Sequence, residues 1–92
     1  MLEKVDFNSR IKNMDPMGKF LYEVADQEYQ LIEKLVNERK RKELTQLDIS
    51  KITGMSQQAV SRIEKYGNKP SLTNLLKYMK AVRLDINSIF NN

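Results

Sequence analysis

The stretch that decides the fold is LTQLDISKITGMSQQAVSRIE, which runs from Leu44 to Glu64. Two hydroxyl residues, Thr45 and Ser56, each stand just before a short segment of helical composition, and Gly54 lies between the segments. Ser and Thr are favoured at helix N-caps because their side-chain oxygens accept hydrogen bonds from free amides of the first turn. Glycine readily adopts the left-handed conformation that closes many helices. The stretch therefore predicts two short helices, the first over 46–53, joined by a tight turn.

The second short segment has two chemically different sides when it is placed on a helix. Ala59, Val60 and Ile63 fall together, and this apolar side is expected to pack into the core. The opposite side carries uncharged amides, a hydroxyl and two cations, namely Gln57, Gln58, Ser61, Arg62 and Lys65. A helix with this composition can present hydrogen-bonding groups outward while its other side holds it in place.

Two short helices joined by a glycine turn make a helix-turn-helix, in which the second helix enters the DNA major groove. A Gln amide can bind adenine through two hydrogen bonds, and an Arg guanidinium can bind guanine O6 and N7. The predicted base-reading residues are Gln57, Gln58, Ser61 and Arg62. The alternative is an ordinary solvated face, as for most surface Gln and Arg. Agreement between the turn, the caps and the polar tip favours a DNA reader.

The chain before this stretch has the pattern of a long amphipathic helix. Asp15 and Pro16 form a helix start, because Asp caps free amides and Pro fits the first helical position. The basic run 39–42 suits a helix C-terminus near its end. Asp26 is able to cap a second helix, so the sequence leaves open whether residues 16–42 form one helix or two.

The chain after this stretch continues with a loop and a longer helix. Gly67 is expected to end the second short helix, and Ser71 is a further N-cap candidate. The apolar residues expected to point inward from the following helix are Leu72, Leu75, Leu76, Met79 and Val82. Ile49 and Ile52 are expected to do so from 46–53. A final short helix carries Ile86, Ile89 and Phe90, which are either the last core layer or dimer contacts. No segment has a strand pattern, so an all-α fold is predicted.

Composition excludes several classes of site. The 92 residues include no cysteine and no histidine, which removes the commonest metal ligands, nucleophiles and general bases. No metal, cofactor or enzymatic activity is therefore expected. The sequence has no apolar run near the ~20 residues that a membrane helix needs, and its start lacks a signal-peptide pattern. These features predict a cytoplasmic protein without membrane contact.

Charge is distributed unevenly along the chain. Residues 1–33 carry four basic and seven acidic groups, for a net charge of −3, whereas residues 34–92 carry twelve and five, for +7. A basic body favours a polyanion partner, and an acidic arm favours a second, different partner. We therefore expect an acidic extension with one amphipathic helix over 1–30 and a DNA-binding domain over 31–92.

The sequence LTQLDISKITGMSQQAVSRIEKYGNKPSL resembles the lambda-repressor/Cro-like helix-turn-helix family, often called the Xre family. The resemblance covers about residues 31–84 and implies a four- to five-helix lambda-repressor-like bundle, with 46–53 as supporting helix and 57–66 as recognition helix. It also implies an ion pair between Arg39 and Glu64. The resemblance and the attraction of cations to phosphate together predict a set of phosphate-contacting residues. These are Gln46, Lys51, Ser56, Lys65, Asn68 and Lys69.

Two positions depart from that family pattern. Ser50 stands where the family usually has Ala, which is tolerable because Ser is also small. Glu43 stands where Gly often ends the first helix, so a turn of different shape is expected there. Readers of this kind commonly bind as dimers to two half-sites, so a homodimer on a near-palindromic operator is expected.

The arrangement of an acidic helix, EVADQEYQLIEKLVNERK, that leads into this domain is similar to that of HigA-type antitoxins. The resemblance implies a repressor of its own operon that also neutralises a small basic RNA-cleaving toxin. The candidate partner-binding residues form an apolar stripe in the acidic extension, made of Met17, Phe20, Leu21 and Val24. Two readings remain open, because the same stripe can pack on its own body. The alternative function is a stand-alone phage or mobile-element repressor without a toxin partner.

Overall fold

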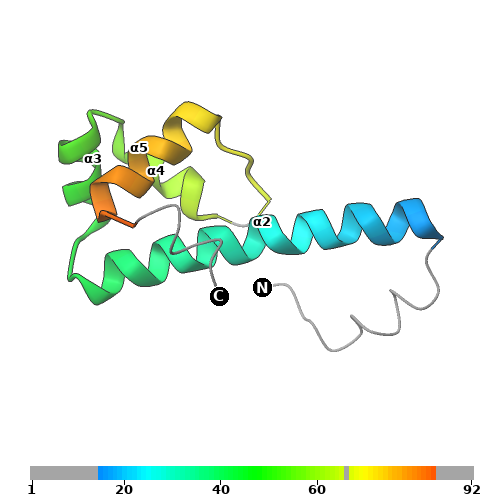
Figure 1. Cartoon of the computed structure of the whole chain (residues 1–92). Helices are drawn as coiled ribbons and strands as arrows, with labels where there is room; N and C mark the ends of the chain where they lie inside the picture. The colour runs from blue at the N-terminus through cyan, green and yellow to red at the C-terminus, as the bar shows by residue number, and fades with distance from the viewer. Residues whose placement is uncertain (1–14, 66, 85–92) are drawn as a thin grey trace. The chain divides into compact units, whose positions relative to one another are not determined.

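The computed structural model describes residues 15–65 and 67–84, and these residues form four α-helices and no strand (Figure 1). The helices are α2 (Pro16–Arg41), α3 (Gln46–Thr53), α4 (Gln57–Glu64) and α5 (Leu72–Val82). The all-α prediction is confirmed for this part of the chain. The described residues fall into two compact units that adjoin in sequence between Gln30 and Leu31.

Helix α2 begins as the sequence predicts. The Asp15 carboxylate accepts a hydrogen bond from the Gly18 amide at 2.7 Å, and Pro16 is the first helical residue. The helix does not break at Asp26, whose carboxylate instead accepts a hydrogen bond at 2.6 Å from the Gln30 side chain, one turn further on. Residues 16–41 therefore form one helix, which decides the alternative that the sequence left open.

The end of α2 is closed by a residue in a conformation that usually requires glycine. Glu43 has φ +57°, its amide donates to the Lys40 carbonyl at 3.0 Å, and the Leu44 amide donates to the Arg39 carbonyl at 3.0 Å. This is the hydrogen-bond pattern of a Schellman motif, which satisfies carbonyl groups that the helix leaves free. The turn therefore keeps the shape that a glycine would give it, contrary to the expectation. Arg83, with φ +58°, follows α5 in the same conformation.

The three hydroxyl N-caps expected from the sequence, Thr45, Ser56 and Ser71, are all present. Thr45 accepts a hydrogen bond from the Asp48 amide at 3.0 Å, and the Asp48 carboxylate accepts one from the Thr45 amide at 2.8 Å, which completes a capping box. Ser56 and Ser71 each accept a hydrogen bond from the amide three residues further on, at 3.0 and 3.1 Å. The starts of α3, α4 and α5 are thus fixed by local chemistry.

The core of the second unit is built from one face of each of its helices. Nine of its described residues are buried, namely Leu35, Ile49, Met55, Val60, Ile63, Tyr78, Met79, Ala81 and Val82. Partly buried apolar side chains pack against them, and these are Leu31, Ile32, Leu44, Ala59, Leu75 and Leu84. Burial of Val60 and Ile63 confirms the predicted apolar side of α4. Met55, in the turn between α3 and α4, is among the buried residues.

Three apolar residues expected in the core are exposed instead. Ile52, Leu72 and Leu76 have 58, 72 and 46% of their surface accessible. On α3, Ile49 already fills the inward position. On α5, the buried face passes through Tyr78 and Val82, so that Leu72 lies at the far end and Leu76 to the side.

The recognition segment is shorter than expected. Helix α4 ends at Glu64, and Lys65 is extended, with φ −83° and ψ 128° and its amide bonded to the Arg62 carbonyl. The helix therefore stops before Gly67, which adopts φ +96° in the following loop. The predictions for residues 1–14 and for Ile86, Ile89 and Phe90 lie outside the described residues.

Candidate DNA interface

The turn between α3 and α4 is held by its own polar groups. Gly54 adopts φ +78° and donates its amide to the Ser50 carbonyl at 2.9 Å. The Ser50 hydroxyl donates to the Met55 carbonyl at 2.6 Å, and the Thr53 hydroxyl accepts a hydrogen bond from the Met55 amide at 3.1 Å. The serine that departs from the family pattern thus spans the turn with a hydrogen bond that alanine cannot make.

The predicted base-reading residues lie on the outward side of α4. Gln57, Gln58 and Arg62 are exposed and Ser61 is half-buried, while Val60 on the same helix is fully buried. Because the Ser56 cap fixes the start of the helix, the two amides occupy its first turn. Two neutral amides and a guanidinium are therefore exposed on α4.

The predicted phosphate-contacting residues do not all have the same surroundings. Lys51, Lys65, Asn68 and Lys69 are exposed, the first on α3 and the others in the segment after α4. Ser56 is exposed too, with its hydroxyl oxygen engaged as the cap of α4. Gln46 differs from them, because it is half-buried and its amide nitrogen donates to a Glu64 carboxylate oxygen at 3.0 Å.

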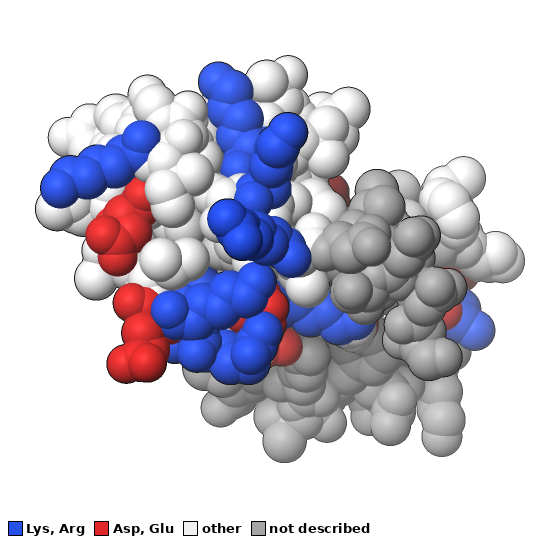
Figure 2. Space-filling view, turned by 60° about the vertical axis from the view of Figure 1, so that its left-hand side comes forward, with Lys and Arg blue, Asp and Glu red and all other residues white. Residues whose placement is uncertain are grey.

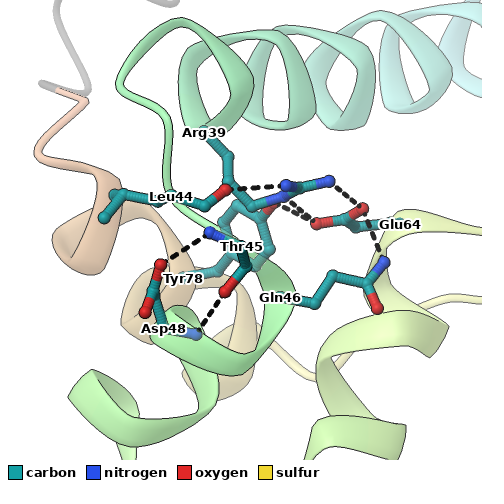
Figure 3. A network of polar contacts seen from close by, with 7 residues as sticks. All are labelled: Arg39, Leu44, Thr45, Gln46, Asp48, Glu64 and Tyr78. Atoms are coloured by element: carbon teal, nitrogen blue, oxygen red, sulfur yellow. Dashed lines mark hydrogen bonds and ion pairs between the residues drawn. The ribbon is translucent and has the colours of Figure 1, made fainter.

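Glu64, the last residue of α4, is the centre of a polar network (Figure 3). Arg39 donates to both of its carboxylate oxygens, from Nε at 2.7 Å and from Nη2 at 3.0 Å. The Tyr78 hydroxyl donates at 2.5 Å, and the Gln46 amide donates from the start of α3. Arg39 also donates from Nη1 to the Leu44 carbonyl at 2.8 Å. The expected pair of Arg39 and Glu64 is confirmed. With Gln46 and Tyr78 added, the network joins all four described helices.

The network keeps Glu64 ionised although its side chain is only 10% exposed. Burial raises the pKa of Glu64, but hydrogen bonds from Arg39, Tyr78 and Gln46 outweigh that effect and lower the pKa below its usual value. Burial also raises the pKa of Tyr78 far above its ordinary value, and the bond to Glu64 adds to the rise. Tyr78 therefore remains a hydrogen-bond donor at any physiological pH.

Several cations of the second unit are engaged near the end of α2. Arg41 donates to Glu38 at 2.9 and 2.7 Å, and Lys42 lies 3.2 Å from the same carboxylate and donates to the Val82 carbonyl. The hydrogen bond from Arg41 is the main cause that lowers the pKa of Glu38 to about 2. Lys and Arg side chains gather on the face shown in Figure 2, with fewer acidic side chains beside them. Such a surface attracts a polyanion.

The first unit presents the predicted apolar stripe outward. Met17, Phe20, Leu21 and Val24 are between 39 and 65% exposed. No helix in the described ranges has the length and apolar character needed to span a membrane. The same ranges contain no cluster of acidic side chains arranged to hold a metal ion.

The sequence did not identify Tyr78 as a residue of the site. Its position three residues after Leu75 placed it on the inward face of α5, and a hydroxyl on an inward ring needs a hydrogen-bond partner. That combination was the available signal. The identity of the partner, Glu64, depends on how α4 and α5 pack and is not visible in sequence spacing.

Two capped helices, a left-handed glycine between them and an outward row of amide and guanidinium groups define a helix-turn-helix DNA-binding fold. In agreement, residues 35–89 match the model of the helix-turn-helix family HTH_3, so the chain belongs to that family of DNA-binding domains. Membership confirms the family resemblance that the sequence predicts.

Two curated proteins that carry the same name are similar to the chain. The chain is 34% identical over 68 residues to Antitoxin HigA1 of Mycobacterium tuberculosis, in both the CDC 1551 / Oshkosh and the ATCC 25618 / H37Rv strains. The matched segment covers 74% of this chain and 46% of the relative, so the chain spans less than half of that protein's length. No solved structure matches the chain.

Proposed function

We propose that the protein is a sequence-specific transcriptional repressor that binds a near-palindromic operator in the cytoplasm as a homodimer. The observation that carries this proposal is the outward row of Gln57, Gln58 and Arg62 on α4, opposite the buried Val60. Three of the eight residues of α4 are exposed and carry groups that can form paired hydrogen bonds with bases. The charge of the segment 34–92 supplies attraction to the backbone of the duplex.

In this proposal, the exposed end of α4 enters the major groove. Gln57 and Gln58 pair with adenine edges, and Arg62 pairs with a guanine. Ser61 assists at the margin of the groove, because its hydroxyl can donate or accept. The phosphate contacts come from the residues around this helix, namely Gln46, Lys51, Ser56, Lys65, Asn68 and Lys69.

Loss of a base-reading side chain is expected to relax sequence preference. Gln57→Ala and Arg62→Ala each remove a paired contact, so each should weaken binding to the preferred site by about 1–3 kcal/mol. Gel-shift titrations on DNA from upstream of its own gene, against a scrambled duplex, measure this. Lys69→Ala should instead weaken both duplexes alike and reduce the salt slope by about one.

Gln27→Ala, an exposed glutamine of the first unit, is the matched control and should leave both affinities unchanged. Equal losses for Gln57→Ala on both duplexes would contradict the assignment of α4 as the reading helix.

We further infer that the protein is the antitoxin of a toxin–antitoxin pair. Three observations support this: the exposed apolar stripe, the acidic groups that accompany it and the similarity to Antitoxin HigA1. An apolar helical stripe between acidic side chains suits the groove of a basic partner. The proposed partner is a small basic RNA-cleaving toxin. The alternative is a stand-alone repressor of a phage or mobile element.

The double substitution Phe20→Ala with Leu21→Ala is expected to abolish partner capture and to leave DNA binding intact. The two side chains are 60 and 57% exposed, so their loss should affect an interface more than the fold. The measurement is co-purification with the product of the neighbouring reading frame, and the control is Leu72→Ala, an exposed leucine of the second unit. Absence of a basic neighbour that binds the wild-type chain would favour the stand-alone repressor.

A further inference from the structure

We propose that Tyr78, which lies on α5 and outside the helix-turn-helix, is a positioning residue for the contact with DNA. Its hydroxyl holds the carboxylate of Glu64, and that carboxylate fixes the direction of the Gln46 amide at the start of α3. The contacts of Tyr78 with Glu64 and of Glu64 with Gln46 lie within the protein. The contact of Gln46 with a phosphate rests on the proposed function.

The carboxylate of Glu64 is held from three elements at once. Oε2 accepts hydrogen bonds from the Tyr78 hydroxyl at 2.5 Å and from Arg39 Nε at 2.7 Å. Oε1 accepts hydrogen bonds from Arg39 Nη2 and from Gln46 Nε2, both at 3.0 Å. The donors come from α2, α3 and α5, so each fixes the carboxylate against a different helix (Figure 3).

Two properties suit Tyr78 to this role: its side chain is buried, and its hydroxyl stays protonated and so remains a donor. The residue is fully buried, so its ring is fixed by core packing and its hydroxyl has a defined position. An arginine fork alone leaves the carboxylate free to tilt about the axis of the pair. A further donor on Oε2 opposes that tilt, and it comes from a side chain that is fully buried.

The bond to Glu64 also determines which way the Gln46 amide faces. A carboxylate accepts hydrogen bonds but does not donate them, so the NH2 group of Gln46, and not its oxygen, must point toward Glu64. A reversed amide would place two oxygens against each other. The second N–H of the same nitrogen is then held in one direction at the start of α3, and in the proposed function it donates to a phosphate.

Tyr78→Phe removes the hydroxyl and keeps the ring, so it isolates the positioning role. Glu64 would lose one donor, its pKa would rise, and the Gln46 amide would be held less firmly. We expect affinity for operator DNA to fall about 3- to 10-fold, the range of one ordinary hydrogen bond. Tyr22→Phe removes a tyrosine hydroxyl outside the network and serves as the control.

The test uses the full chain and two measurements. In the free protein, the side-chain amide signals of Gln46, assigned by comparison with Gln46→Ala, should shift in Tyr78→Phe and stay in place in Tyr22→Phe. In gel-shift titrations on the upstream DNA, Tyr78→Phe should reduce affinity in the wild-type background. It should have little effect when Gln46→Ala is already present, because the two residues act in series.

Two results would overturn the proposal. One is an unchanged Gln46 amide signal in Tyr78→Phe. The other is the same loss of DNA affinity from Tyr78→Phe with and without Gln46, which would mean that Tyr78 affects binding only through general stability. If the wild-type chain binds no upstream DNA, the proposed function fails and the phosphate contact fails with it, while the amide signals still decide whether Tyr78 positions Gln46.

Discussion

Replacing Arg39 with Met is expected to destabilise the unit that holds the helix-turn-helix by about 3 kcal/mol at pH 7, because the substitution leaves Glu64 as an uncompensated buried charge. The side chains of Arg39 and Glu64 are 11 and 10% exposed, so water replaces the lost partner poorly. The Leu44 carbonyl also loses its donor at the end of α2. Urea unfolding monitored by circular dichroism measures the effect.

The size of this loss should depend on pH. In the wild-type protein the pKa of Glu64 is lowered from 4.5, so its contribution to stability is present above that value and is lost as the pH falls through the lower folded value. Burial is the largest single influence on this pKa and raises it, so loss of the opposing Arg39 hydrogen bond should make the pKa of Glu64 rise. Glu64 then takes up a proton more readily as the pH falls, so Arg39→Met should be less destabilising at pH 4 than at pH 7.

Arg41→Met is the control for the arginine substitution. Arg41 pairs with Glu38 at the surface, and its side chain is 67% exposed, so little change is expected at either pH. An equal loss for Arg39→Met at both pH values would contradict the account of Glu64 as a buried carboxylate held ionised by its partners.

Truncating Leu35 to Ala is expected to destabilise the same unit by about 3 kcal/mol, within the usual range of 2–5 kcal/mol for a buried leucine. Leu35 on α2 is fully buried among residues from the other three helices. In a domain of this size such a loss is a large share of the total free energy of unfolding. Thermal and urea unfolding at neutral pH provide the measurement.

Leu72→Ala makes the same chemical change at a leucine that is mostly exposed, and it should alter stability by less than about 0.5 kcal/mol. Similar losses from Leu35→Ala and Leu72→Ala would show that the buried set described here is not the core of the unit.

Much of the fold could be predicted because its signals are local. Thr45, Ser56 and Ser71 cap helices through bonds to amides only three residues away, and Gly54 reverses the chain through its own φ angle. Such features do not depend on the rest of the molecule. The continuity of α2 past Asp26 was harder, because an aspartate in a helix can either cap or pair with a residue one turn away.

The expectation that Ile52, Leu72 and Leu76 are buried was wrong, because burial at these positions depends on how far the core extends. Helical spacing gives the side of a helix on which a residue lies, but it does not say where along the helix the neighbouring helices end. Leu72 shares the apolar spacing of α5 and is nevertheless exposed, while Tyr78 was omitted and is fully buried. Spacing was sufficient for Val60 and Ile63, which lie in the middle of the unit.

In the candidate site, too, local features could be predicted from the sequence, whereas contacts between helices could not. Placing Gln57, Gln58 and Arg62 on the outward side of α4 required only periodicity and a cap. The bond between Gln46 and Glu64 joins residues eighteen positions apart in the sequence and depends on how α3 packs on α4. Tertiary packing, and not residue type, decides such contacts.

Glu43 and Arg83 hold left-handed backbone conformations that glycine adopts without steric conflict, at a cost of about 1 kcal/mol each. The folded state is therefore less stable than it would be with glycine at both positions. Proteases cleave transiently opened chains, and the opened fraction rises about tenfold for each 1.4 kcal/mol lost. A chain with these two residues should be degraded faster than one with glycine in both places.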